Sequence, residues 1–289
     1  MLTLLRLLRA QQWYKNTVIF LALFFTKNLF TPDLLESSIL GFISLCFMSS
    51  SYYIINDILD AREDRQHPEK KTRPIAAGTV GVGAAALLSL GLMAASLFIA
   101  FSLSAEFALF PIALLASSLA YNFWLRKVAI VDVHVIAFNF LLRAVSGAVL
   151  IDVYASPWLV TTVFFMALFL AVGKRRSDLS VLKDALKHKD VYAVYNERLL
   201  DMMIVVITAV LLFTYSLYTF VVHEKPYPYM MLTIPFVSFI IFRYLYFISI
   251  NHEVSRKTHL VFLDAQMLAG LLLWVAVSYA VMYYMIPVA

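Results

Sequence analysis

The stretch Asn56-Asp57-Ile58-Leu59-Asp60-Ala61-Arg62-Glu63-Asp64 marks the place where a long apolar segment gives way to a strongly charged one. If this stretch is helical, Asp57, Asp60 and Asp64 stand at positions i, i+3 and i+7 and share one face. Carboxylates that lie so close repel one another unless a cation sits among them. A Mg²⁺ ion held by one or two carboxylates together with substrate phosphates would supply that cation. A solvated acidic helix end is the simpler alternative.

The composition of the chain places this stretch in a membrane protein. The 289 residues are 62% hydrophobic and 14% charged, whereas a soluble domain is roughly half apolar and about a quarter charged. The mean hydropathy of +0.83 agrees with this assignment. The single cysteine, Cys46, lies inside an apolar segment and excludes an internal disulfide. We therefore expect an all-α integral membrane protein, with membrane lipids and no nucleic acid among its partners.

Apolar segments recur along the chain at the length that a helix needs to cross the hydrocarbon core, about 20 residues. Because no linker divides them, they predict about nine transmembrane helices in one bundle and a single domain over residues 1–289. A basic amphipathic segment, residues 1–15, would lie in the interface before the first span. The predicted spans cover residues 16–31, 34–56, 80–103, 106–124, 128–150, 157–174, 200–222, 227–248 and 260–286.

Lysine and arginine are distributed unequally over the loops between these spans. Alternate loops carry nearly all of them, and the opposite loops carry only Lys27 and Lys225. By the positive-inside rule, the N-terminus is cytoplasmic and the C-terminus lies outside. Two long polar loops, residues 57–79 and 174–199, fall on the cytoplasmic side. They predict an active site that faces the cytoplasm from the plasma membrane.

The first polar loop sets basic residues beside its carboxylates. Lys70, Lys71 and Arg73 follow Asp64 closely in the sequence. Acidic residues that hold Mg²⁺ next to a basic cluster suit a diphosphate, because the metal and the cations can bind different oxygens. Attraction to lipid headgroups is the alternative explanation of the basic residues.

The second polar loop opens with Gly173-Lys174-Arg175-Arg176-Ser177-Asp178 and is basic, with a single carboxylate. Lys174 and Asp178 stand at i and i+4, so they share a helix face. Lys174 could be part of a cationic site or a snorkelling anchor at a helix end. The residues that follow, Tyr192 and Tyr195 among them, are expected to form a solvated amphipathic helix.

Arg143 lies deep in the predicted span 128–150, where an arginine is energetically unfavourable and usually has a partner. Asn139 precedes it by one turn, and Asp132 precedes it by three turns on roughly the same face. These residues would either line a polar cavity that opens to the cytoplasm or form an internal ion pair.

The motif Asn56-Asp57-x-x-Asp60-x-x-x-Asp64 resembles the signature of the UbiA superfamily of intramembrane prenyltransferases, which are helical and mostly nine-span. In the aromatic prenyltransferases of that superfamily the second motif is also aspartate-rich, whereas here it is basic. The chain is more similar to the decaprenyl-phosphate phosphoribosyltransferase subgroup over about its first 180 residues. The motifs that carry this similarity are Gln12-Trp13-x-Lys15-Asn16, Arg65-x-His67-Pro68-x-Lys70, Arg73-Pro74-Ile75-Ala76-Ala77-Gly78 and Gly173-Lys174-Arg175.

The resemblance implies a Mg²⁺-dependent phosphoribosyl transferase. It would move the 5-phosphoribosyl group of phosphoribosyl diphosphate onto a polyprenyl phosphate and release pyrophosphate, for cell-envelope precursors. Asp57, Asp60 and Lys174 would be catalytic, and Asp57, Asp60 and Asp64 would bind Mg²⁺. A homo-oligomer is left open. The implied substrate-binding residues are Lys15, Asn56, Lys70, Lys71, Arg73, Tyr121, Arg126, Asp132, Arg143, Arg175 and Asp178.

Two other functions remain as alternatives. The first is a UbiA-type prenyltransferase that moves a prenyl diphosphate onto an aromatic or lipid acceptor, for which a second aspartate cluster near residues 174–182 is missing. The second is a transporter of an anionic solute, which would carry broken helices and polar groups near mid-membrane. Only Arg143 and Asn139 favour transport.

Overall fold

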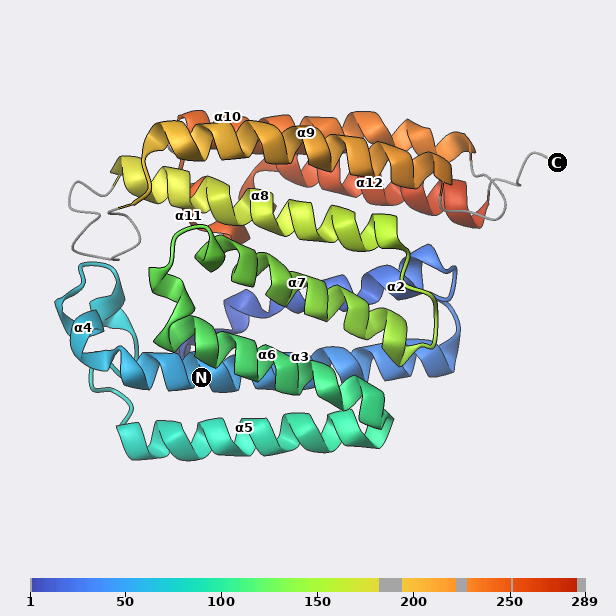
Figure 1. Cartoon of the computed structure of the whole chain (residues 1–289). Helices are drawn as coiled ribbons and strands as arrows, with labels where there is room; N and C mark the ends of the chain where they lie inside the picture. Colours follow the sequence, from blue (N-terminus) through green and yellow to red (C-terminus); the bar gives the residue numbers. More distant parts are fainter. Residues whose placement is uncertain (1, 182–193, 222–227, 251, 285–289) are drawn as a thin grey trace. The chain divides into compact units, whose positions relative to one another are not determined.

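The computed structural model describes residues 2–181, 194–221, 228–250 and 252–284, and over these residues the protein is helical without strands (Figure 1). The all-α prediction is therefore confirmed for the described chain. The helices form two compact units. Unit 1 comprises residues 1–126 and 142–154, and unit 2 comprises residues 127–141 and 155–289. The single-domain organisation stays a prediction.

Eight helical segments of the described chain are long and apolar enough to cross a membrane, which agrees with an integral membrane protein. Two of these helices begin with a proline, Pro32 or Pro157. A proline is tolerated at the first position of a helix because the N–H of that position has no partner within the helix. Ser104 and Asp264 cap two others through their side chains. The long helices are α3 (Pro32–Leu59), α5 (Val82–Leu103), α6 (Ala105–Phe123), α7 (Val131–Leu150), α8 (Pro157–Val181), α9 (Glu197–Val221), α10 (Ile234–Ser249, preceded by η6, Pro228–Thr233) and α12 (Ala265–Tyr283).

The first predicted span, residues 16–31, does not form one long helix. After α1 (Leu2–Leu7), the chain continues as a 3-10 helix, η1 (Ala10–Ile19), and a short α-helix, α2 (Phe20–Phe25). The helical region ends near Lys27, which has a positive φ of 62°. Because a 3-10 helix rises about 2.0 Å per residue and an α-helix about 1.5 Å, η1 and α2 together extend about 29 Å. That length is close to the thickness of a hydrocarbon core, about 30 Å.

In unit 1, α3 and α5 pack side by side (Figure 1). Two reciprocal serine pairs join these helices. Ser44 donates to the carbonyl of Ser96 and Ser96 to that of Ser44, at 2.9 and 2.7 Å. Ser51 and Ser89 repeat this exchange at 2.9 and 3.1 Å. Small residues let the two backbones approach closely, and the hydroxyls satisfy each other away from water.

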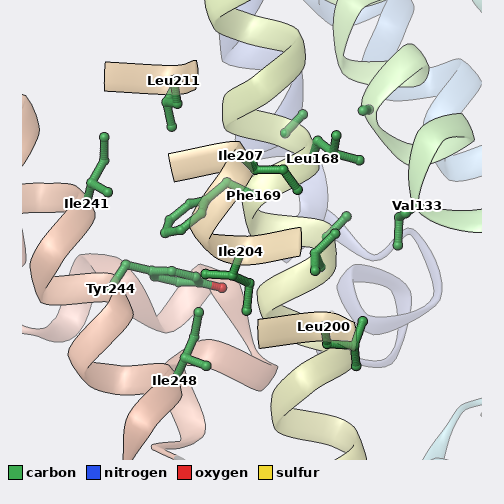
Figure 2. Packing of buried hydrophobic residues seen from close by; sticks show 14 of the residues in the cluster. Val133, Leu168, Phe169, Leu200, Ile204, Ile207, Leu211, Ile241, Tyr244 and Ile248 are labelled. Carbon is green, nitrogen blue, oxygen red and sulfur yellow. The ribbon is translucent and has the colours of Figure 1, made fainter. Parts of the chain in front are cut away.

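In unit 2, α8, α9 and α10 share a buried apolar core (Figure 2). The rings of Phe169 and Tyr244 lie 5.3 Å apart at the centre of this cluster. The buried residues that α9 contributes to this core recur every three or four positions, as expected for one face of an amphipathic helix. The labelled members in Figure 2 are Val133, Leu168, Phe169, Leu200, Ile204, Ile207, Leu211, Ile241, Tyr244 and Ile248.

Both polar loops are more helical than expected. The first contains the end of α3, the short helix α4 (Ala61–Gln66) and a 3-10 turn, η2 (Lys70–Thr72). The second begins inside α8, which continues to Val181, so the motif Gly173–Asp178 lies on a helix. Residues 182–193 of that loop lie outside the described residues. Three short elements complete the chain: η3 (Leu125–Lys127), α11 (Glu253–Arg256) and η7 (Thr258–Leu263).

Candidate functional site

The three carboxylates of the first motif lie where α3 gives way to α4. Asp60 interrupts the helix, with φ and ψ of −87° and 2°. Asp57 and Asp64, on either side of this interruption, are buried, whereas Asp60 is half-buried. Asp57 and Asp64 share one basic partner, Arg73, whereas Asp60 pairs with Arg126.

Arg73 joins the two buried carboxylates. Its Nη1 lies 3.0 Å from Asp57 Oδ1 and 2.6 Å from Asp64 Oδ2. The turn that follows fixes this arginine, because Ile75 is buried in a cluster of unit 1. Gly78 closes the turn with a φ of 73°, which a glycine adopts without strain.

Two more basic residues reach the same carboxylates. Lys70 Nζ lies 3.7 Å from Asp64 Oδ1, as the clustering of charges in the sequence suggested. Arg9 donates to Asp57 Oδ1 and lies 4.9 Å over the ring of Tyr53. Sequence reasoning missed Arg9, which is 48 residues away from Asp57. Its place among the first fifteen residues suggested only a membrane-surface role.

Asp60 instead pairs with Arg126, whose Nη1 lies 3.1 Å from each carboxylate oxygen. The cluster made of these residues is called the first polar cluster below. It contains four basic side chains against three carboxylates, so one positive charge is in excess. A net positive cluster with embedded carboxylates can attract a phosphorylated anion. Its members are Arg9, Asp57, Asp60, Asp64, Lys70, Arg73 and Arg126.

The donor set of the first polar cluster suits Mg²⁺. Asp57 and Asp64 already converge on one positive group, the Nη1 of Arg73. Mg²⁺ is usually held by one or two carboxylates plus phosphate oxygens, so these two side chains fit the metal. Among the described residues, no three acidic, histidine or cysteine side chains converge closely enough to hold one ion. A role for Asp60 in metal binding stays a prediction.

Arg143 is buried within unit 1 and lies on α7. Its Nε donates to Asn16 Oδ1 at 2.7 Å and its Nη2 to the hydroxyl of Tyr52 at 2.8 Å. One turn later, Gly147 lets η1 approach, because a Cβ there would lie 2.0 Å from the carbonyl oxygen of Ile19. The glycine and the arginine therefore fix η1 and α7 against each other.

The remaining site residues predicted in unit 1 differ in their exposure to solvent. Lys71 is exposed. The other three are half-buried on η1, α3 and α6, and they are Lys15, Asn56 and Tyr121.

The second motif lies on the last turns of α8 in unit 2. Lys174 is exposed, while Gly173 and Arg175 on either side of it are buried. A Cβ at Gly173 would lie 2.7 Å from the side chain of Ile248, so the glycine lets α8 approach α10.

Arg175 and Asp132 are bonded to each other. Arg175 Nε donates to Asp132 Oδ2 at 2.8 Å, and the hydroxyl of Tyr195 donates to Asp132 Oδ1 at 2.6 Å. Burial, and then this hydrogen bond, raise the pKa of Tyr195 well above its usual range. The prediction of a solvated Tyr195 is wrong, because its side chain closes a buried network. Sequence gave no signal for this pairing, since 63 residues separate Tyr195 from Asp132.

The short helix α11 also contacts the second motif. Arg256 Nε donates to Asp178 Oδ1 at 3.2 Å, and Ser177 donates to Ser255 Oγ at 2.8 Å. Arg176 pairs on the other side with Asp201, at 2.7 Å. Asp178, the last residue of the motif, thus has a basic partner, Arg256, that was not predicted from the sequence.

Comparison with protein families gives a match over most of the chain. The sequence model of the UbiA prenyltransferase family matches residues 17–267. The fold is also similar to that of a solved UbiA homolog from Archaeoglobus fulgidus bound to DMAPP and Mg²⁺. The TM-score is 0.70 at 21% identity, over 97% of this chain and 99% of that chain.

Curated relatives add a more specific similarity. The decaprenyl-phosphate phosphoribosyltransferase of Mycolicibacterium smegmatis is 35% identical over 182 residues, which make up 62% of this chain and 57% of that protein. The enzyme of the same name from Mycobacterium tuberculosis is 33% identical over 176 residues, or 60% of this chain and 58% of that protein. The chain thus spans a little over half the length of these two relatives.

Proposed function

The chain belongs to the UbiA prenyltransferase family. We propose that it transfers the 5-phosphoribosyl group of phosphoribosyl diphosphate to a polyprenyl phosphate. The observation that carries this proposal is the basic character of the second motif. Its one acid on α8, Asp178, is already paired with Arg256. A reaction between two phosphorylated substrates needs more fixed cations than one in which only the donor is phosphorylated. The names of the similar curated relatives support the same reaction.

The first polar cluster would bind the diphosphate of the donor. Asp57 and Asp64 would hold Mg²⁺, which when bound neutralises charge on phosphate oxygens. Arg9, Lys70 and Arg73 would then be available to the phosphate groups from which the ribosyl carbon departs. Fixed cations of this kind stabilise charge that develops on a leaving group, because they need no reorganisation during the reaction.

The second motif would bind the phosphate of the acceptor. Lys174 is exposed on α8 and is the proposed ligand of that phosphate; Lys15 and Arg143 remain further candidates. The new bond joins an acceptor phosphate oxygen to the ribosyl carbon as the bond to pyrophosphate breaks. A phosphate dianion is already a nucleophile, so no strong general base is required of the protein.

Exposed apolar side chains of the long helices offer the polyprenyl tail a membrane-facing surface. We place the reaction at the cytoplasmic face of the plasma membrane, where the positive-inside rule puts both polar motifs. A role in lipid-linked precursors of the cell envelope follows from the same proposal.

The test uses purified full-length protein in lipid nanodiscs with radiolabelled phosphoribosyl diphosphate, decaprenyl phosphate and Mg²⁺. We expect a labelled lipid product and release of pyrophosphate, and neither after addition of EDTA. A parallel reaction supplies a prenyl diphosphate and an aromatic acid. Product only in that second reaction would overturn the proposal in favour of prenyl transfer. Uptake of a labelled anion into vesicles without any product would favour transport.

A further inference from the structure

Tyr195 lies between α8 and α9, and its hydroxyl makes two hydrogen bonds in the interior of unit 2. It donates to Asp132 Oδ1 at 2.6 Å and accepts the backbone N–H of Ile130 at 2.7 Å. A phenol hydroxyl has one proton to donate, so this donor is committed to Asp132. The side chain of Tyr195 is 4% exposed, which sets it apart from a surface tyrosine.

Asp132 is held between two partners that use different oxygens. Oδ1 accepts from Tyr195 and Oδ2 accepts from Arg175 Nε. Asp132 is fully buried and Arg175 is 3% exposed. A buried charge pair is stable only when its geometry is good and its remaining lone pairs are satisfied. The Tyr195 hydroxyl therefore supplies a bond that the pair requires.

We propose that Tyr195 is a positioning residue for the second motif, acting through Asp132 on Arg175. With Asp132 fixed, Arg175 sets the rotation of α8 about its axis. Because each residue of an α-helix turns about 100° from the last, the direction of Lys174 follows from that of Arg175. The catalytic meaning of this role rests on the proposed function, in which Lys174 binds a phosphate.

Other contacts also hold the same turns of α8 in unit 2, among them the pair of Arg176 with Asp201 at 2.7 Å. Gly173 packs against Ile248 and Tyr244, which fixes the distance between α8 and α10. Asp178 and Ser177 reach α11, four residues beyond Lys174 and Gly173. Loss of the Tyr195 hydroxyl should therefore loosen the start of the motif without unfolding α8. A misplacement of about 1 Å in a reacting group can lower a rate by about a hundredfold.

The test is Tyr195→Phe, with Tyr215→Phe as the matched control. Tyr215 is an equally buried tyrosine of unit 2 whose hydroxyl bonds to Thr233 at 2.6 Å and Trp274 at 2.8 Å. Thr233 lies roughly 16 Å from Tyr244 along α10, at about 1.5 Å per residue, so the control is remote from the second motif. Both variants lose one buried hydroxyl and should unfold at similar temperatures.

The first measurement needs no substrate. Hydrogen–deuterium exchange of a peptide over residues 171–180 should be faster in Tyr195→Phe than in the parent protein, and unchanged in Tyr215→Phe. Equal exchange in all three proteins would overturn the positioning role. This measurement decides the proposal even if the protein proves to transfer no phosphoribosyl group.

The second measurement is kcat/KM for the polyprenyl phosphate in the phosphoribosyl transfer assay. Tyr195→Phe should lower it by about tenfold, the effect of roughly 1.4 kcal/mol, and mainly through KM. In a Lys174→Gln background, which has already lost the positioned group, Tyr195→Phe should have little further effect. A tenfold loss in both backgrounds, or the same loss in Tyr215→Phe, would show a general effect on the fold and overturn the proposal.

Discussion

The Nη1 nitrogen of Arg126 lies 3.1 Å from both carboxylate oxygens of Asp60, across 66 residues of sequence. This pair separates Asp60 from Asp57 and Asp64, which share Arg73. The first motif therefore consists of two carboxylates that converge and a third that is neutralised by an arginine from beyond α6. A guanidinium and a metal ion compete for the same carboxylate oxygens, and this competition can be measured.

Arg126→Gln should have opposite effects on the metal and on the donor substrate. The half-saturating concentration of Mg²⁺ should fall about threefold, because the first polar cluster loses a positive charge that repels the metal and because the Asp60 carboxylate is freed, an effect of roughly 0.6 kcal/mol. The KM for phosphoribosyl diphosphate should rise, because the first polar cluster loses a positive charge. Steady-state titrations of Mg²⁺ and substrate measure both effects. Arg62→Gln, which removes an exposed charge from α4, is the control and should change neither.

Asp57→Asn should lower turnover by about a hundredfold, or roughly 2.7 kcal/mol of transition-state stabilisation. It should also lower the free energy of unfolding by about 2 kcal/mol, because Arg9 and Arg73 lose a buried counter-charge. Turnover is measured in the transfer assay and stability by thermal unfolding in detergent. Glu63→Gln, an exposed acid of α4, should leave both unchanged. Normal turnover in Asp57→Asn would mean that the acidic motif is structural.

Gly147→Ala should destabilise unit 1, whereas Gly91→Ala should not. An added Cβ at Gly147 would lie 2.0 Å from the carbonyl oxygen of Ile19, so backbone must move, at a cost of about 2 kcal/mol or more. Nothing lies within 4 Å of a Cβ at Gly91, and alanine there favours the helix by up to about 1 kcal/mol. Thermal unfolding of the two variants in one detergent measures the difference. Equal melting temperatures would contradict the close approach of η1 and α7.

The pair of Asp264 with Arg243 should make stability depend on acid pH. The hydrogen bond from Arg243, at 2.9 Å, lowers the pKa of Asp264 below its usual value. Because the folded pKa is below the unfolded one, the stabilisation is complete above about pH 5 and is lost as pH falls below about 4.

Asp264→Asn isolates this charge, because asparagine also caps a helix and can still accept from the N–H of Met267. The variant should be less stable than the parent at neutral pH, by about 1 kcal/mol or less since the pair is partly exposed. The difference should shrink as the pH falls through the pKa of Asp264 in the folded protein, which the Arg243 hydrogen bond holds below its usual value. Thermal unfolding across this range measures it, and a constant difference at every pH would contradict the ion-pair explanation.

Sequence predicted much of the candidate site because local spacing controls it. Residues 57, 60 and 64 are close in sequence at the junction of α3 and α4, and Lys70 and Arg73 follow within the same turn-rich segment, so their proximity needed little tertiary information. The partners of these residues were less predictable. Arg9, Arg126, Tyr195 and Arg256 reach the motifs from other elements, and their identity depends on how helices pack. Conversely, Asp132 and Arg175 were predicted to bind substrate, and the structure pairs them with each other.

The helical membrane architecture and the acidic and basic characters of the two motifs follow from the order of residues alone. Hydropathy and the spacing of charges are properties of the linear chain, so they favour membrane-spanning helices whatever the packing between helices. The packing of the helices is what makes residues 10–19 a 3-10 helix, pairs Asp60 with Arg126 and brings Tyr195 to Asp132. These features depend on distances between side chains far apart in sequence, because a buried polar group takes whichever partner the packing brings within about 3 Å.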